Sequence, residues 1–313
     1  MKIPVVFTVD NKWALPTYIA VHSLFESARL KTEYICIIIS EDLDQKNKEE
    51  IEKLQKGTRH SIQFLNLNKL PIEDIKVTNY WTKEVYFRLF LCDILQEYDK
   101  VIFSDVDVLF INDLSNAYKV DLSNSEIAAV AAEKNSSKAK MHTYYSENNH
   151  SYIYWDGFMV MNLQLMRERE WSKRCIEFYR KYADTLNMVD LEIINLAALN
   201  PVRLPIRYVY LQSLWSENNI KKSTDYIFLK DIYTIEELEN EKKHVVIIHY
   251  AGEMGKPWLR LCMPKEYKNY YVKAPEVLIR ENRRYRIKQI IHVVARSIYR
   301  HTIKRIIQFV ESI

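Results

Sequence analysis

Runs of apolar residues alternate along the chain with segments that have helical periodicity. Continuous apolar runs are typical of strands buried on both faces, and apolar positions spaced three to four residues apart are typical of helices with one solvated face. This alternation predicts an α/β fold: an open, mostly parallel sheet flanked by helices, with ligands at the carboxyl ends of its strands. In the first half of the chain the predicted strands are residues 3–9, 34–39, 61–67, 101–103 and 127–132, and the predicted helices are 14–28, 40–55 and 82–96.

The pattern becomes less regular after about residue 150. No internal repeat or low-complexity linker divides the chain, so we expect one main domain over residues 1–262 and a basic helical extension over 263–313. The elements predicted in the second half are a strand at 158–163, helices at 171–186 and 191–198, and a strand at 245–248 that stops at His249.

Positive charge is concentrated at the C-terminal end. The formal net charge is +4, but from residue 280 onward nine Lys and Arg face two acids, a local charge of 9 − 2 = +7. His292, Arg296, Arg300 and Lys304 recur every four residues, and aliphatic residues follow the opposite face of the predicted helix. This pattern is typical of helices that lie on anionic membranes, although a helix packed on the body or on a second copy would also show it. No base-reading motif accompanies the charge, so we expect no nucleic-acid partner.

Glycine and cysteine usage exclude several kinds of site. With 4 glycines in 313 residues, neither G-x-G-x-x-G nor G-x-x-x-x-G-K-[ST] can be assembled, so a bound nucleotide needs a metal or side chains to hold its phosphates. The four cysteines have no C-x-x-C spacing, which argues against zinc or thioredoxin-type chemistry. The N-terminal apolar run is typical of a strand rather than a signal peptide, and no uncharged apolar stretch reaches the roughly 18 residues of a membrane span. We expect a cytoplasmic or peripheral membrane protein.

The segment KVIFSDVDVLF, residues 100–110, is the strongest candidate for chemistry. Its apolar strand delivers Asp105 and Asp107 to one face of an extended chain, because residues i and i+2 point the same way. Two carboxylates there suit Mg²⁺ or Mn²⁺. A D-x-D pair also arises by chance: Asp42 and Asp44 form a second one, which precedes a charged helical run and is typical of a helix cap.

A second segment, VVIIHYAGEMGKPW at residues 245–258, ends a strand at His249 and continues through two glycines to Lys256. Histidine is an acceptable Mn²⁺ ligand beside carboxylates, and a lysine behind a tight glycine turn can meet a phosphate. The alternatives are a histidine satisfied by hydrogen bonds and a lysine on a solvated loop.

Taken together, these segments resemble glycosyltransferase family 8, which includes bacterial lipooligosaccharide galactosyl- and glucosyltransferases and glycogenin-like proteins. The resemblance runs from residue 3 to about 258 and implies a nucleotide-binding fold of the GT-A type. The matching pieces, in order, are VVFTVDNKW, YFRL, SDVDVLF, DGFMVMNL, DLEIIN and HYAGEMGKPW.

The resemblance implies how a UDP-sugar would be bound. Thr8 and Asp10 match residues that contact uracil and ribose, and Trp13 matches an aromatic residue that stacks on the base. Gly252 and Lys256 match diphosphate contacts. The turn before Lys256 is about one residue longer than relatives usually have, so the lysine aligns less firmly than the histidine.

The resemblance also implies the metal ligands and one sugar contact. Asp105, Asp107 and His249 match Mn²⁺ ligands, with Asp105 also near the ribose. Arg88 matches an arginine that helps to hold the donor sugar, and its alternative is an arginine on the surface of a helix.

Two stretches depart from the pattern of the family. Where relatives often have Asn, a small residue and Gly, residues 155–157 are Trp-Asp-Gly, which changes the wall facing the sugar. Where relatives have Asp-Gln-Asp, residues 190–192 are Asp-Leu-Glu, and Leu191 can act neither as nucleophile nor as hydrogen-bond donor. Asp190 and Glu192 remain candidates to bind sugar hydroxyls or to stabilise oxocarbenium charge, and otherwise would be charges at the start of a helix.

We therefore expect a retaining hexosyltransferase that depends on Mn²⁺ or Mg²⁺ and uses UDP-galactose or UDP-glucose. Its expected acceptor is a cell-surface glycan or glycolipid such as lipopolysaccharide or lipooligosaccharide, reached from the inner face of the cytoplasmic membrane. Retention follows from the resemblance alone, and Leu191 favours departure and attack on the same face over a covalent intermediate. The alternative is a non-catalytic scaffold that binds nucleotide sugars and in which Trp155 and Leu191 reflect lost chemistry.

Overall fold

The computed structural model describes residues 1–67, 83–139, 150–252, 254–260, 262–284 and 287. The chain divides into two units, residues 1–256 (unit 1) and residues 257–313 (unit 2). Unit 1 carries the strands and every predicted site residue. The boundary expected after residue 262 stays a prediction.

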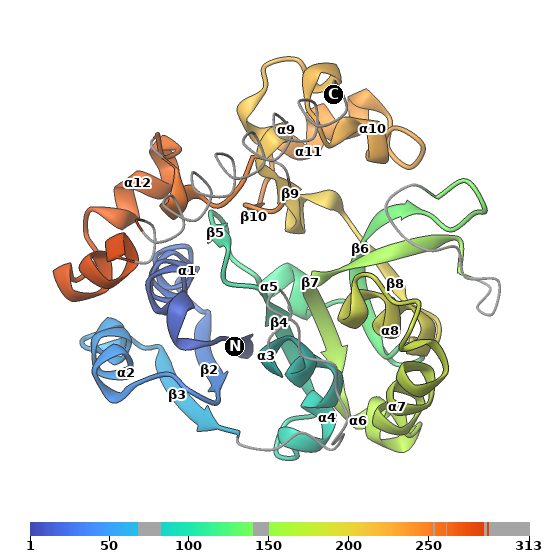
Figure 1. The fold of residues 1–313 in the computed structure, drawn as a ribbon, viewed down its shortest axis with the longest axis horizontal. Coiled ribbons are helices and arrows are strands. Elements are labelled where there is room, and N and C mark those ends of the chain that lie inside the picture. Colours follow the sequence, from blue (N-terminus) through green and yellow to red (C-terminus); the bar gives the residue numbers. More distant parts are fainter. Residues whose placement is uncertain (68–82, 140–149, 253, 261, 285–286, 288–313) are drawn as a thin grey trace, which may run out of the picture. The chain divides into compact units, whose positions relative to one another are not determined.

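Unit 1 is built on a seven-stranded sheet with the order β3-β2-β1-β4-β7-β6-β8 (Figure 1). The β3-β2-β1-β4 half is parallel throughout, β7 runs antiparallel to β4 and β6, and β8 is parallel to β6. The predicted α/β sheet, mostly parallel, is confirmed. Its strands are β1 (Lys2–Thr8), β2 (Glu33–Ser40), β3 (Ser61–Asn66), β4 (Lys100–Ser104), β6 (Ile127–Lys134), β7 (Tyr152–Asn162) and β8 (Val202–Leu204).

A second, three-stranded sheet has the order β5-β10-β9. Its members are β5 (Val108–Phe110), β9 (Tyr210–Leu211) and β10 (Ile247–His249). β10 pairs antiparallel with β5 and parallel with β9. The predicted strand before His249 is confirmed as β10, but β5 and β9 were not predicted because runs of two or three residues carry no periodicity.

Helices cover the large sheet of unit 1. One face packs against α3, α4 and α6–α8 through a continuous apolar core that includes Phe103, Met159, Trp171 and Ile194. Figure 1 shows α7 and α8 side by side beside β7. The helices are α1 (Ala14–Glu26), α2 (Gln45–Glu52), α3 (Lys83–Phe87), α4 (Leu91–Ile94), α5 (Ser115–Tyr118), α6 (Leu163–Glu168), α7 (Trp171–Tyr182), α8 (Val189–Ala197), α9 (Gln212–Ser216), α10 (Tyr226–Leu229) and α11 (Ile235–Lys242).

Two predicted helices differ most from the structure. The helix expected at 40–55 begins only at Gln45, where Asp44 caps it by accepting a hydrogen bond of 2.9 Å from the backbone N–H of Asn47. The cap predicted from the second D-x-D pair is thus confirmed. The helix expected at 82–96 is interrupted by a 3₁₀ turn, η3 (Arg88–Phe90), between α3 and α4. A 3₁₀ stretch within a helix often marks a functional hinge or a strained sequence, and here it begins at a buried arginine.

Unit 2 contains the short 3₁₀ turn η6 (Pro257–Leu259), the helix α12 (Lys265–Tyr271) and a helical stretch at 276–284. Within it the ring centroids of Trp258 and Tyr267 lie 5.9 Å apart, and Asn282 donates a hydrogen bond to the carbonyl of Trp258. The basic face predicted from His292 to Lys304 lies outside the described residues. Among the described residues, the helices are all too short or too polar to cross a membrane.

Candidate active site

Asp105 and Asp107 lie in the short connection between β4 and β5. The backbone N–H of Asp105 donates to the carbonyl of Gly157 on β7 at 2.8 Å, and the carbonyl of Asp107 accepts from Tyr250 just after β10 at 2.8 Å. Each aspartate is therefore fixed by a different neighbouring strand. The antiparallel register of β5 and β10 sets His249 opposite Val108, next to Asp107.

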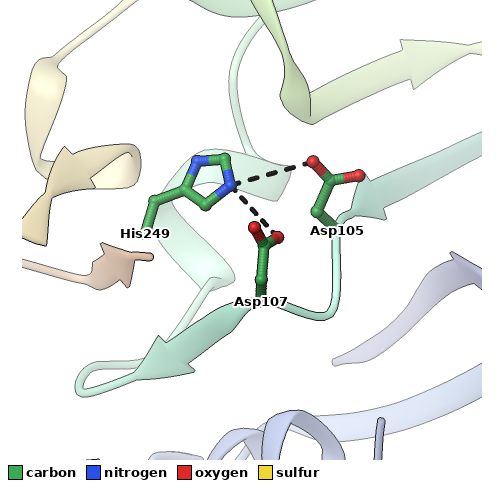
Figure 2. Close-up of side chains that lie close together, drawn as sticks. All are labelled: Asp105, Asp107 and His249. Atoms are coloured by element: carbon green, nitrogen blue, oxygen red, sulfur yellow. Dashed lines mark hydrogen bonds and ion pairs between the residues drawn. The ribbon is translucent and has the colours of Figure 1, made fainter. Parts of the chain in front are cut away.

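The three predicted metal ligands meet at this point. Nε2 of His249 lies 3.2 Å from Oδ1 of Asp107 and 3.8 Å from Oδ2 of Asp105, and Figure 2 shows the imidazole turned toward both carboxylates. One ligand atom from each residue falls within 4.8 Å of the others. Two carboxylate oxygens and one imidazole nitrogen form a donor set that suits Mn²⁺, and hence these residues fit a divalent metal.

Gly157 makes room for this group. A β-carbon at Gly157 would stand 2.7 Å from Cε1 of His249 and 2.8 Å from Oδ2 of Asp105, closer than real β-carbons approach. The backbone of Gly157 is part of β7 and is not in the left-handed region. Glycine is needed here for space, because any side chain would displace a candidate ligand.

Burial and charge control the protonation of this group. Burial raises the pKa of Asp107, but Lys256 and His249 lower it by more, so the net pKa lies well below the usual range of a carboxyl group. Burial lowers the pKa of His249, but Asp107 and Asp105 together raise it by more, so the net pKa is raised. Burial is also the main reason why the pKa of Asp105 is raised. The ammonium of Lys256 is bound directly to Oδ2 of Asp107.

Arg88 joins three carboxylates into one cluster. Its Nη2 lies 2.9 Å from Asp105, and its Nη1 lies 3.1 Å from Asp156 and 3.2 Å from Asp190. All four side chains except that of Asp105 are at most 12% exposed. Burial lowers the pKa of Arg88 but the three carboxylates raise it by more, so the guanidinium stays charged. Burial, and then the charge of Asp190, raise the pKa of Asp156 to about 7.

Two buried polar atoms around the site lack partners within the described part of the chain. They are Oγ1 of Thr8, at the end of β1, and Nε of Arg88. Buried polar groups are nearly always hydrogen-bonded, and those that are not require an explanation such as a missing ligand. Both residues were predicted to contact the nucleotide sugar, and both have spare hydrogen-bonding capacity to do so.

The loop after β1 brings the remaining nucleotide candidates to the same edge. Asp10 caps the 3₁₀ turn η1 (Asn11–Trp13) by accepting a hydrogen bond of 2.9 Å from the N–H of Lys12. The ring of Trp13 lies beside Lys256, whose Nζ is 5.8 Å from the ring centroid. Trp13, Lys256 and Asp107 are therefore neighbours, although they are far apart in sequence.

The turn before Lys256 depends on its glycines. Gly252 has φ of +86° and Gly255 has φ of +71°, in the left-handed region where other residues are strained. The side-chain amide of Gln212, on α9, donates to the carbonyls of Ala251 at 2.9 Å and Gly255 at 3.1 Å. The predicted tight turn is thus present and anchored.

The two candidate catalytic residues of α8, Asp190 and Glu192, have different surroundings in the structure. Asp190 belongs to the Arg88 cluster, but the carboxylate of Glu192 accepts hydrogen bonds from the backbone N–H groups of Asn187 at 2.6 Å and Met188 at 2.9 Å. The structure places Glu192 in the role of a charge at the start of a helix, which was its alternative. Leu191 is 2% exposed and packs in an apolar cluster with Ile153, Leu196 and Trp155.

Asp156 was missed as a candidate site residue. The sequence carries one signal for it: an acid directly before Gly157, inside the otherwise apolar run that forms β7. That signal does not reveal the partner, because Arg88 is 68 residues away.

Comparison with known proteins agrees with this geometry. The model of glycosyl transferase family 8 matches residues 4–262, and the chain belongs to that family of glycosyltransferases. It is 22% identical to the lipopolysaccharide 1,2-glucosyltransferase of Escherichia coli, over 72% of this chain and 63% of that protein. It is also 22% identical to galacturonosyltransferase-like protein 10 of Arabidopsis thaliana, over 90% of this chain and 78% of that one.

The fold has a close match among solved structures. The galactosyltransferase LgtC, solved in complex with donor and acceptor sugar analogues, superposes with a TM-score of 0.68 at 21% identity, covering 89% of this chain and all (100%) of that one. The predicted GT-A fold and the predicted membership of family 8 are confirmed.

Proposed function

We propose that this protein transfers galactose or glucose from the UDP-sugar to a cell-surface glycan or glycolipid acceptor, with retention and with Mn²⁺ or Mg²⁺ as cofactor. The observation that carries the proposal is the meeting of Asp105, Asp107 and His249 beside Lys256 at the carboxyl edge of the sheet. Nucleotides bind at this edge in open α/β sheets. The proposed class of acceptor is supported by the similarity of the chain to the lipopolysaccharide 1,2-glucosyltransferase.

In this proposal Asp105, Asp107 and His249 hold the metal, which when bound supplies positive charge to the leaving diphosphate. Lys256 moves from Asp107 to the diphosphate and adds a second positive charge. Trp13 stacks on the base, and the free hydroxyl of Thr8 together with Asp10 contacts the nucleoside. Arg88, oriented by Asp190 and Asp156, holds the donor sugar.

The metal assignment is tested with Asp107→Asn. We expect Mn²⁺-dependent hydrolysis of UDP-galactose or UDP-glucose to fall by about 100-fold or more, since a charged ligand is lost. Asp99→Asn is the control, because the Asp99 side chain is 79% exposed near the opposite end of β4. Near-parental turnover in Asp107→Asn would refute the assignment. The rival scaffold function predicts that UDP and Mn²⁺ bind but that no free sugar is released.

We also propose that the basic C-terminal segment attaches the protein to the inner face of the cytoplasmic membrane. Its support is the sequence alone, with a local charge of 9 − 2 = +7 from residue 280. Replacing Arg296, Arg300 and Lys304 with Glu in the full chain should abolish binding to anionic vesicles and spare hydrolysis of the UDP-sugar. Unchanged vesicle binding would contradict the proposal.

A further inference from the structure

The family match leaves open whether the donor sugar is neutral or acidic. The chain is similar to a glucosyltransferase and, at the same identity, to a galacturonosyltransferase-like protein. The charge of the donor sugar therefore has to be inferred from the side chains beside the candidate metal ligands. The Arg88 cluster lies there, because Asp105 belongs to both: its Oδ1 contacts Arg88 and its Oδ2 faces His249.

The charges of this cluster do not balance. One guanidinium contacts the three carboxylates of Asp105, Asp156 and Asp190. The two terminal nitrogens of Arg88 are therefore both engaged. A second cation of the site, Lys256, is bound to Asp107. A metal held by Asp105, Asp107 and His249 would compensate Asp105, and the ionised carboxylates of Asp156 and Asp190 would still exceed Arg88 by one negative charge.

This negative charge is close to where a donor sugar would be. The side chain of Asp105 is 26% exposed and that of Asp156 is 12% exposed, so these two carboxylates form the open side of the cluster. In a mostly buried site such charges act through a low dielectric and are poorly screened. Sugar hydroxyls can donate hydrogen bonds to them, whereas a carboxylate would be repelled.

Asp156 adds the second carboxylate at Nη1 of Arg88 and so determines whether that nitrogen can bind an acidic group of a ligand. Without it, Nη1 of Arg88 would contact Asp190 alone and could turn toward an acidic group of a ligand. With it, an anionic ligand would have to compete with two carboxylates for the same nitrogen. The buried Asp156 already has its pKa raised to about 7, so a further anion nearby would require still more protonation.

We infer that Asp156, together with Asp190 on Arg88, selects a donor with an uncharged sugar and excludes uronic-acid donors. The inference rests on the proposed function, since it assumes that the sugar of a UDP-sugar reaches this cluster. Specificity would come from a repulsive element built against the acidic competitor as much as from contacts to the neutral sugar.

The test compares donors that differ only at C6: UDP-glucose with UDP-glucuronate, and UDP-galactose with UDP-galacturonate. Binding to the full chain is measured by calorimetry with Mn²⁺ present, with UDP alone as reference. We expect at least one neutral donor to bind about tenfold or more tighter than its uronate partner. In Asp156→Asn, which keeps the shape and removes the charge, that ratio should shrink by about tenfold.

The outcomes are distinguishable. If UDP itself does not bind, the proposed function fails and this inference fails with it. If UDP binds but a uronate donor binds as tightly as its neutral partner, only this inference is overturned. An unchanged ratio in Asp156→Asn overturns the role of Asp156. Should that variant not fold, Asp156→Ser serves in its place, and the ratio in the parent protein still decides for or against a neutral donor.

Discussion

Gly157 and His249 lie so close that a single methyl group on the glycine would occupy the space of the imidazole, 2.7 Å from its Cε1. The contact joins β7 to the end of β10, two strands that belong to different sheets. The candidate metal ligands therefore have space only because β7 carries no side chain at Gly157. A substitution at Gly157 is a sensitive test of the site.

Gly157→Ala should weaken Mn²⁺ binding by about 10- to 100-fold, because His249 or Asp105 must move away from the other ligands. Calorimetric titration with Mn²⁺ measures this directly. Gly57→Ala is the matched control: Gly57 has φ of +72° and no atom within 4 Å of the added carbon. It should lose about 1 kcal/mol of stability and keep its metal affinity. Parental Mn²⁺ affinity in Gly157→Ala would contradict the assignment of this group as the metal site.

Lys256→Met should change two affinities in opposite directions. The ammonium of Lys256 is bound to the carboxylate of Asp107 and competes with a metal for it. Removing this ammonium should therefore raise the affinity of the nucleotide-free protein for Mn²⁺ by roughly tenfold. With Mn²⁺ present, affinity for UDP should fall by a similar factor, because a diphosphate contact is lost. The exposed Lys243→Met provides the control. If both affinities fall, Lys256 does not exchange between the carboxylate and the diphosphate.

Leu191→Gln introduces the residue that the resemblance to family 8 matches to this position, yet we expect it to be harmful. Leu191 is buried among apolar side chains, so an amide there would lose its hydrogen bonds to water, at a cost of about 1–3 kcal/mol in the free energy of unfolding. Urea denaturation measures this loss, and Leu191→Met should cost less than about 1.5 kcal/mol. A rise in sugar-transfer or hydrolysis rate in Leu191→Gln would show instead that this side chain reaches the substrate.

The stability of the metal-free protein should depend on pH through Asp156. Its pKa is raised from 3.8 to about 7 on folding, so between these values the folded state binds more protons than the unfolded state. Stability therefore falls as pH rises through this window, by up to about 1.4 kcal/mol per pH unit, and this loss levels off above it.

Asp156→Asn should remove that component. Measured in EDTA by urea denaturation, the stability of the variant relative to the parent should increase from about pH 4 to about pH 7 and then stay constant. A difference between variant and parent that is independent of pH would mean that Asp156 is not held in its neutral form by the fold.

The features that the sequence predicted correctly depend on local patterns. The apolar runs before Thr8 and Asp105 are long enough to identify buried strands, and a parallel sheet places the ends of such strands along one edge. The grouping of Asp105, Asp107 and His249 follows from this and from the resemblance to family 8.

The features that it missed depend on contacts between distant segments. Whether Asp156 points toward Arg88 is set by the register of β7 on β4, which no local pattern specifies. The resemblance matched Leu191 and Glu192 to positions near the sugar, but a match in position does not fix which way a side chain of α8 faces. In the structure Asp190 faces Arg88, and its two neighbours face the apolar cluster and the start of the helix.

The pairing of β7 with β4 limits how the length of this chain could change in evolution. The register is regular from Phe158, opposite Ser104, to Asn162, opposite Lys100, so a residue inserted there would reverse every side chain before it and direct one at His249. The pairing of β7 with β6 is irregular before this stretch: Ala129 lies opposite Met159 but Ala131 lies opposite Tyr154, and a second irregular step follows between Ala131 and Glu133. Insertions and deletions should be absent between Phe158 and Asn162, where the register is regular.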